Sequence, residues 1–161
     1  MNKKILILGV GNVLLGDEGF GVHAMRYLAE NYNWPENVRL IDGATLGLML
    51  MGELMECDLA VILDIATADN APGTFYEGDP DSLGSSLSLP PSMHQTGIKD
   101  VLISCDLAGH SPEVLLFCME PYNYHIIRPR LTEEAEKRLP AFCDMVVSSL
   151  REIGVVAEAK F

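Results

Sequence analysis

Acidic side chains at three points of the chain could contact one metal ion if the fold brings them together. Asp17 and Glu18 follow the first apolar run, Asp42 ends the second, and Asp64 ends the third. An acidic helix start is ordinary by itself. Carboxylates at about 4 Å, however, repel each other by roughly 4 kcal/mol at an effective dielectric constant near 20, so a cluster of them favours a cation. The pattern therefore indicates a metal-contacting site.

A histidine could supply the softer ligand that such a site needs. Three of the four histidines carry no clear signal, because they lie in an expected helix or in polar loops without an evident acidic partner: His23, His110 and His125. His94 differs because it closes a long stretch rich in Gly, Ser and Pro, residues 78–94, directly before a helix. Together with Glu18 and Asp64 it makes two oxygen ligands and one imidazole. That set suits zinc, nickel, iron or manganese.

The glycine-rich stretch at residues 9–22, GVGNVLLGDEGFGV, begins like a dinucleotide-binding turn. Gly9 and Gly11 match the first two glycines of G-x-G-x-x-G, but the third position is Leu14. The acidic pair that follows would repel a phosphate at the helix N-terminus. We therefore expect no nucleotide, and expect Gly9 and Gly11 to serve a tight turn and close backbone packing.

Continuous apolar runs alternate with helical patterns along the chain, which predicts a doubly wound, mostly parallel sheet with helices on both faces. Strands are expected at residues 4–10, 38–42, 59–65, 74–77 (a short edge strand) and 114–119, and helices at about 18–32, 46–56, 95–107 and 131–153. The first strand is expected to be central, and the last helix to begin at Thr132. Because ligands bind beyond the carboxyl ends of parallel strands, this fold gathers Glu18, Asp42 and Asp64 at one edge.

Length and composition indicate a single α/β domain over residues 1–161. The formal net charge of −12 argues against binding to nucleic acid or to anionic lipid. No apolar run approaches the length of a membrane span. The four cysteines form no C-x-x-C pair, so neither a zinc ribbon nor a disulfide scaffold is indicated, and we expect a cytoplasmic protein.

Four motifs occur in an order and spacing typical of one family: GVGNVLLGDEGFGV at residue 9, DGATLG at residue 42, LDIATADNAPGT at residue 63 and HQTG at residue 94. From Ile5 to about Ile153 the chain resembles the nickel-iron hydrogenase maturation endopeptidases. The resemblance implies a phosphorylase/hydrolase-like α/β fold. It also implies removal of a C-terminal extension from the hydrogenase large-subunit precursor once nickel has been inserted.

The resemblance also implies roles for individual residues. The metal-contacting positions of the family match Glu18, Asp64 and His94, which are the three that the spacing indicates. Asp42 matches an aspartate-glycine motif, although Ala44 stands where relatives often have glycine. A carboxylate such as Asp42, or the metal itself, would polarise the peptide carbonyl or activate water, and the identity of the base is left open.

Nickel is expected to arrive on the precursor rather than as a permanently bound cofactor. The sequence contains no H-E-x-x-H motif and no G-x-S-x-G elbow, and its cysteines lie in or beside apolar runs. We expect Asp17 to cap the following helix or to accept a hydrogen bond behind the metal-contacting residues.

Two other functions remain compatible with parts of this pattern. A non-catalytic chaperone that senses nickel in the large subunit could use the same acidic residues. A receiver-like signalling domain also has an acidic pair after its first strand and an aspartate at the end of its third. Such a domain needs a lysine after its fifth strand, and none occurs between Lys99 and Lys137.

Overall fold

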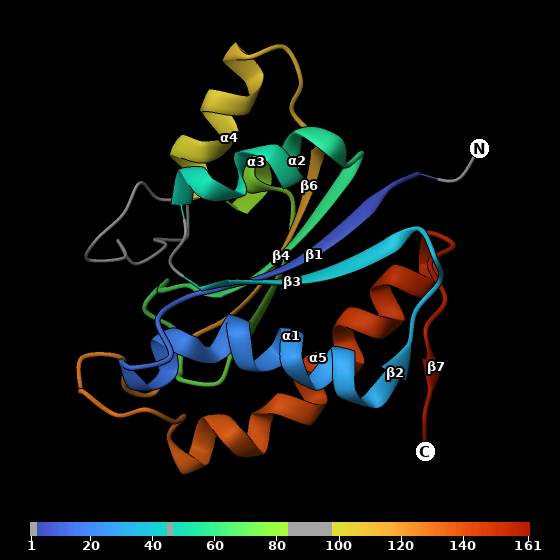
Figure 1. Ribbon diagram of the computed structural model, residues 1–161. Helices are drawn as coiled ribbons and strands as arrows, with labels where there is room; N and C mark the ends of the chain where they lie inside the picture. Colours follow the sequence, from blue (N-terminus) through green and yellow to red (C-terminus); the bar gives the residue numbers. More distant parts are fainter. Residues whose placement is uncertain (1–2, 45–46, 84–97) are drawn as a thin grey trace.

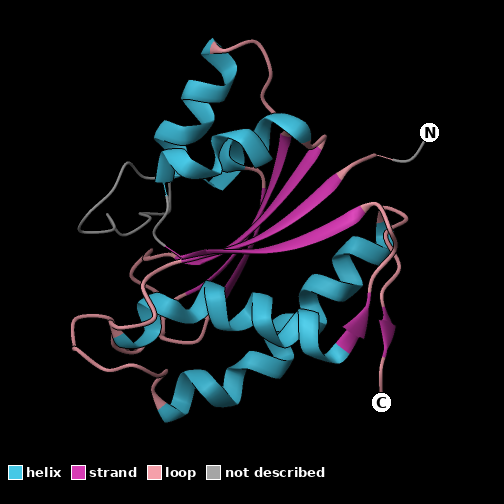
Figure 2. Cartoon of the chain, in the orientation of Figure 1, coloured by secondary structure: helices cyan, strands magenta, loops and turns pink. Residues whose placement is uncertain are grey.

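Five strands form the central sheet of the molecule (Figure 1 and Figure 2). The computed structural model describes residues 3–44, 47–83 and 98–161. The strand order is β3-β1-β4-β6-β5, with β5 antiparallel to β6 and all other neighbours parallel. The strands are β1 (Ile5–Val10), β3 (Val38–Ala44), β4 (Leu59–Ile65), β5 (Phe75–Gly78) and β6 (Glu113–Met119).

Helices cover both faces of the sheet. Figure 1 shows α1 (Phe20–Asn31) and α5 (Glu133–Glu152) below it, and α2 (Met51–Glu56), α3 (Pro80–Leu83) and α4 (Ile98–Leu107) above it. Two 3₁₀ turns, η1 (Gly16–Gly19) and η2 (Gly47–Leu50), precede α1 and α2. A small antiparallel ribbon joins β2 (Tyr32–Asn33) to β7 (Glu158–Ala159). In the described part of the chain, no helix has both the length and the apolar character required to cross a membrane.

Two hydrophobic cores explain why the strands have continuous rather than alternating apolar runs. Successive side chains of a strand point to opposite faces of the sheet. On β1, Ile5 and Ile7 therefore join the core beneath α1 and α5, while Leu6 and Leu8 join the core beneath α2 and α4. Both faces are buried, as in other sheets with helices on each side.

The predicted doubly wound α/β fold is confirmed, and β4 has the predicted bounds. The other four strands of the central sheet agree with prediction within two residues. Thr132 begins α5 as predicted, and its hydroxyl accepts a hydrogen bond from the Ala135 N–H at 3.2 Å. The expected central position of the first strand is wrong, because β4 occupies the middle of the sheet.

Other differences concern short elements. The ribbon of β2 and β7 was not expected from the sequence, and η2 replaces the first turn of the helix expected from residue 46. Within the stretch expected to be a loop, residues 78–94, α3 forms a short helix. The remainder of that stretch, from residue 84 onward, lies outside the described residues.

Candidate functional site

The carboxyl ends of the parallel strands meet at one edge of the sheet, on the left of Figure 1. Gly9 of β1 lies beside Asp42 of β3 and beside Leu63 of β4. Asp64 is the next residue of β4, and η1 carries Glu18 back over the end of the same strand, where their charges interact. The sheet edge thus brings Glu18 and Asp64 together, as the sequence predicts.

Two glycines allow this close approach. Gly11 has a φ of 133°, and a Cβ there would collide with the carbonyl oxygen of Glu18. A Cβ at Gly21 would collide with the carbonyl oxygen of Leu63, the residue before Asp64. The absence of side chains at both positions lets the turn and the start of α1 pack directly on the end of β4. The expectation of close backbone packing in this glycine stretch is therefore confirmed.

Glu18 and Asp64 form a buried carboxyl pair, each only 6% exposed. Oδ1 of Asp64 accepts a hydrogen bond from the Ile65 N–H at 2.8 Å. The side chain of Glu18 accepts no hydrogen bond, and neither residue forms an ion pair, within the described part of the chain. Such a pair favours a proton or a cation between its members.

Burial raises the pKa of both carboxyl groups above their ordinary values, and that of Asp64 well above. The negative charge of Glu18 raises the pKa of Asp64 further. A divalent cation would remove this repulsion and would compensate the loss of hydration.

His94, the third predicted metal-contacting residue, lies outside the described residues. The residues that the structure does describe contain no group of three or more His, Cys, Asp or Glu side chains that could hold a metal ion. They therefore supply two of the predicted metal-contacting groups.

Asp42 is not brought together with this pair. Its side chain shares the α1 face of the sheet with Val38 and Leu40, whereas Asp64 shares the opposite face with Ile62. Oδ2 of Asp42 forms an ion pair with Arg26 of α1 at 2.9 Å. Oδ1 is buried and has no hydrogen-bond partner among the residues described.

Of the two roles predicted for Asp17, the helix cap is wrong; the carboxylate accepts hydrogen bonds, but from a segment far along the chain. The residue before α1 is Gly19, and no side chain caps that helix. Asp17 is fully buried and reaches across to the segment that follows β6. Its Oδ2 accepts hydrogen bonds from the N–H groups of Tyr122 (2.9 Å) and Asn123 (3.1 Å). Its Oδ1 accepts from the Thr132 N–H at 2.9 Å, and the Thr132 hydroxyl donates to the same carboxylate at 3.0 Å.

The segment that Asp17 holds by hydrogen bonds carries His125, which was not among the predicted site residues. His125 lies close enough to Glu18 for its charge to oppose the rise in the pKa of that carboxyl group. No sequence signal identified this pairing, because the two residues are far apart in the chain. In contrast, His110 lies at the amino edge of the sheet, where its Nε2 donates to the Cys57 carbonyl at 2.8 Å.

Glu120 is a buried carboxylate that directly follows β6 and was not among the predicted site residues. Its Oε1 accepts hydrogen bonds from the Tyr76 hydroxyl (2.6 Å) and the Ala68 N–H (2.9 Å). These bonds join the segment after β4 to β5. The rule that selected Asp64 could have found Glu120, because Glu120 also lies at the carboxyl end of a parallel strand.

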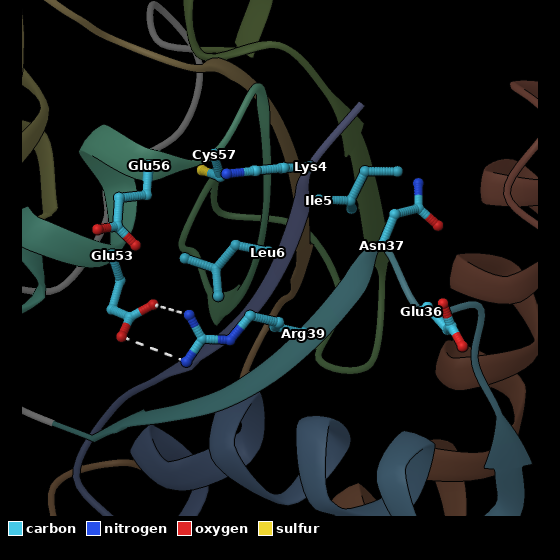
Figure 3. Close-up of a pocket in the computed structure, with 9 residues that line it drawn as sticks. All are labelled: Lys4, Ile5, Leu6, Glu36, Asn37, Arg39, Glu53, Glu56 and Cys57. Carbon is cyan, nitrogen blue, oxygen red and sulfur yellow. Dashed lines mark hydrogen bonds and ion pairs between the residues drawn. The ribbon is translucent and has the colours of Figure 1, made fainter. Parts of the chain in front are cut away.

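The hollow in Figure 3 lies at the opposite edge of the sheet. It has a volume of about 460 Å³ and lies between the start of β1, β3 and α2. Arg39 and Glu53 form an ion pair across it at 2.6 Å. A second hollow, lined in part by Lys3 and Glu113, also lies at the amino ends of the strands. Neither hollow includes Glu18 or Asp64, which lie at the carboxyl ends of the strands.

Comparisons with known proteins agree on one family. A family model described as hydrogenase maturation protease matches residues 22–149. The chain is 36% identical to the hydrogenase expression/formation protein HoxM of Azotobacter vinelandii over 159 residues, which cover 98% of this chain and 77% of HoxM. It is 35% identical to the hydrogenase 2 maturation protease of Escherichia coli K12 over 158 residues, covering 96% and 94% of the two chains.

Solved structures agree with these sequence comparisons. The hydrogenase maturating endopeptidase HybD from E. coli superposes with a TM-score of 0.87 at 33% identity, covering 98% of each chain. The architecture in Figure 2 is therefore shared with a solved structure over nearly the whole length.

Proposed function

This chain belongs to the hydrogenase maturation protease family, and we propose that it removes the C-terminal extension of a nickel-iron hydrogenase large-subunit precursor after nickel insertion. Membership of this family supports peptidase activity. It also leads us to set aside the receiver-like alternative.

The observation that carries the nickel-dependent part of the proposal is the buried pair of Glu18 and Asp64. Within the described residues neither carboxylate forms an ion pair, although both are largely removed from water. We propose that both carboxylates, with His94, contact nickel that the precursor already holds. In this proposal the nickel is part of the substrate, and its charge offsets the repulsion between the carboxylates.

Cleavage requires a group that activates water near the bound precursor, and we propose Asp42 for this role. Arg26 holds one of its oxygens, which leaves Oδ1 without a partner in the described part of the chain. Oδ1 is buried among the described residues, so in this proposal it accepts a proton from water that reaches it when the precursor binds. An Asp42→Asn variant should bind nickel-loaded precursor but process it more slowly, and normal processing by this variant would exclude Asp42 as the base.

We expect nickel-loaded precursor to bind and to be cleaved at least about tenfold better than nickel-free precursor, because an empty site gives the carboxylate pair nothing to coordinate. Pull-down and cleavage with matched precursor preparations measure both effects. A Glu18→Gln variant, which lacks one of the two charges, should show a smaller preference for nickel-loaded over nickel-free precursor. Equal binding and cleavage of both precursors would contradict the proposal, and binding without cleavage would identify the chaperone alternative.

Thiol reagents should leave processing unchanged, because the four cysteines are buried in the folded protein. Burial raises the pKa of Cys57 to about 11 and raises the pKa of the other three thiols as well: Cys105, Cys118 and Cys143. Thiolates are therefore scarce at neutral pH. Processing rates before and after iodoacetamide treatment test this, with denatured protein as the control for reagent activity. Stoichiometric inactivation traced to one cysteine would contradict a mechanism without a thiol nucleophile.

A further inference from the structure

Two exposed apolar residues lie on two hydrogen-bonded loops next to the candidate site. Ile127 is 90% exposed and Leu14 is 58% exposed. The backbone joins their segments, because the Arg128 N–H donates to the Leu14 carbonyl at 2.9 Å and the Gly16 N–H donates to the Arg128 carbonyl at 3.0 Å. Single exposed apolar residues are common on protein surfaces. An adjacent pair on two joined loops provides a larger apolar surface for a partner.

The segment that carries Ile127, residues 121–131, contains no helix or strand, but an isolated β-bridge pairs its Arg128 with Leu15. The carboxylate of Asp17 holds the two ends of this segment through Tyr122, Asn123 and Thr132. The Asp17 N–H also donates to the Asn123 carbonyl at 2.9 Å. A loop that is already ordered loses less conformational entropy when a partner binds.

The charge of this segment is opposite to that of the whole protein. Residues 121–131 contain Arg128, Arg130 and His125 and no carboxylate, whereas the chain has a net charge of −12. Neither arginine forms an ion pair with any residue that the structure describes. The Nε of Arg128 is buried and lacks a hydrogen-bond partner in the same set of residues. The segment therefore offers cationic donors beside an apolar surface.

This surface adjoins the carboxyl pair. Leu14 and Glu18 belong to the same connection between β1 and α1, and His125 lies near Glu18. A protein that brings a metal ion to Glu18 and Asp64 would therefore also lie over Leu14 and Ile127.

We propose that Leu14, Ile127 and Arg130 form a docking surface for the hydrogenase large-subunit precursor. The complementary precursor segment would present an apolar side chain flanked by carboxylates, next to the nickel that the precursor holds. This inference rests on the proposed function, because it takes the precursor as the partner. It adds the surface that binds the polypeptide of the precursor, separately from its metal ion.

The test uses the full-length protein and nickel-loaded large-subunit precursor from the same organism. Ile127→Asp should raise KM for cleavage and Kd for binding by at least about tenfold, while kcat stays within about twofold. The double variant Leu14→Asp/Ile127→Asp should weaken binding further. Arg130→Glu should weaken binding by about three- to tenfold at low salt, with a smaller effect at high salt.

Leu107→Asp is the matched control, because Leu107 is 84% exposed on α4, away from the loops that carry Leu14 and Ile127. It should leave KM and Kd within about twofold of wild type. Circular dichroism and unfolding curves establish that all variants are folded.

The outcomes separate this inference from the proposed function. If the double variant Leu14→Asp/Ile127→Asp binds and cleaves the precursor with the Kd and KM of the wild-type protein, the docking surface is overturned and the peptidase proposal is unaffected. Binding that is lost in Ile127→Asp, in a protein that never cleaves the precursor, would support the docking surface and refute the peptidase proposal. An equal loss of binding in Leu107→Asp would also overturn the inference, because the effect would then not depend on this surface.

Discussion

Replacing Asp64 by asparagine should reduce precursor processing by about a thousandfold and should leave the purified protein at least as stable as wild type. A carboxylate about 4 Å from a cation contributes roughly 4 kcal/mol per unit charge at an effective dielectric constant of 20. Each 1.36 kcal/mol corresponds to about a tenfold change in rate, so loss of this interaction gives roughly the stated effect. The asparagine oxygen can still accept the hydrogen bond from Ile65.

The stability part of this prediction follows from the raised pKa of Asp64. The folded protein holds this proton more tightly than the unfolded chain does, where the pKa is near the ordinary value of 3.8. The resulting stability is fully present below that value and is lost as the pH rises through the folded-state pKa. Asparagine does not titrate. The stability of Asp64→Asn relative to wild type should therefore increase with pH over this range.

Urea unfolding in metal-free buffer at several pH values measures this difference, and cleavage of nickel-loaded precursor measures the activity. Glu18→Gln should behave in the same way, with a smaller stability effect because the rise in its pKa is smaller. Normal processing by either folded variant would refute the assignment of the pair to nickel. A loss of stability that is constant with pH would indicate a structural role for the carboxylates instead.

Replacing Asp17 by alanine should destabilise the protein by about 3–5 kcal/mol, because it leaves buried hydrogen-bond donors without an acceptor. The affected groups include the backbone N–H groups of Tyr122, Asn123 and Thr132. Denaturant unfolding monitored by circular dichroism gives the change. Asp17→Asn should lower the free energy of unfolding by less, because the amide oxygen of asparagine can still accept hydrogen bonds.

Arg151→Ala is a suitable surface control, because Arg151 is exposed near the end of α5. Its free energy of unfolding should stay within about 0.5 kcal/mol of wild type. A similar small effect of Asp17→Ala would show that the hydrogen bonds of this carboxylate do not hold the 121–131 segment.

Patterns within a short stretch of sequence predicted much of the fold. The continuous apolar run at residues 59–65 was sufficient to place β4, since burial on both faces leaves no polar position in the run before Asp64. Thr132 and the acidic residues after it were sufficient to place the start of α5. The sheet order and the ribbon of β2 and β7 were not predictable in this way, because they depend on packing between distant segments.

The candidate site shows the same division. The rule that ligands bind beyond the carboxyl ends of parallel strands was enough to bring Glu18 and Asp64 to one edge. It did not show that Asp42 faces the other side of the sheet. That orientation depends on the register of the strands and on which residues of each strand point to which face. The partners of Asp17 and the position of His125 depend on the folding of residues 121–131 against η1.

The lack of an ion pair at Glu18 and Asp64, within the described structure, bears on proofreading. Two carboxylates sense charge and distance, and they distinguish poorly between divalent ions of similar size. Under the proposed function, this pair rejects an empty precursor but does not by itself reject one loaded with a wrong divalent metal. The choice of nickel must then come from His94, the third proposed contact, or from the earlier step of metal insertion, which proteolysis makes irreversible.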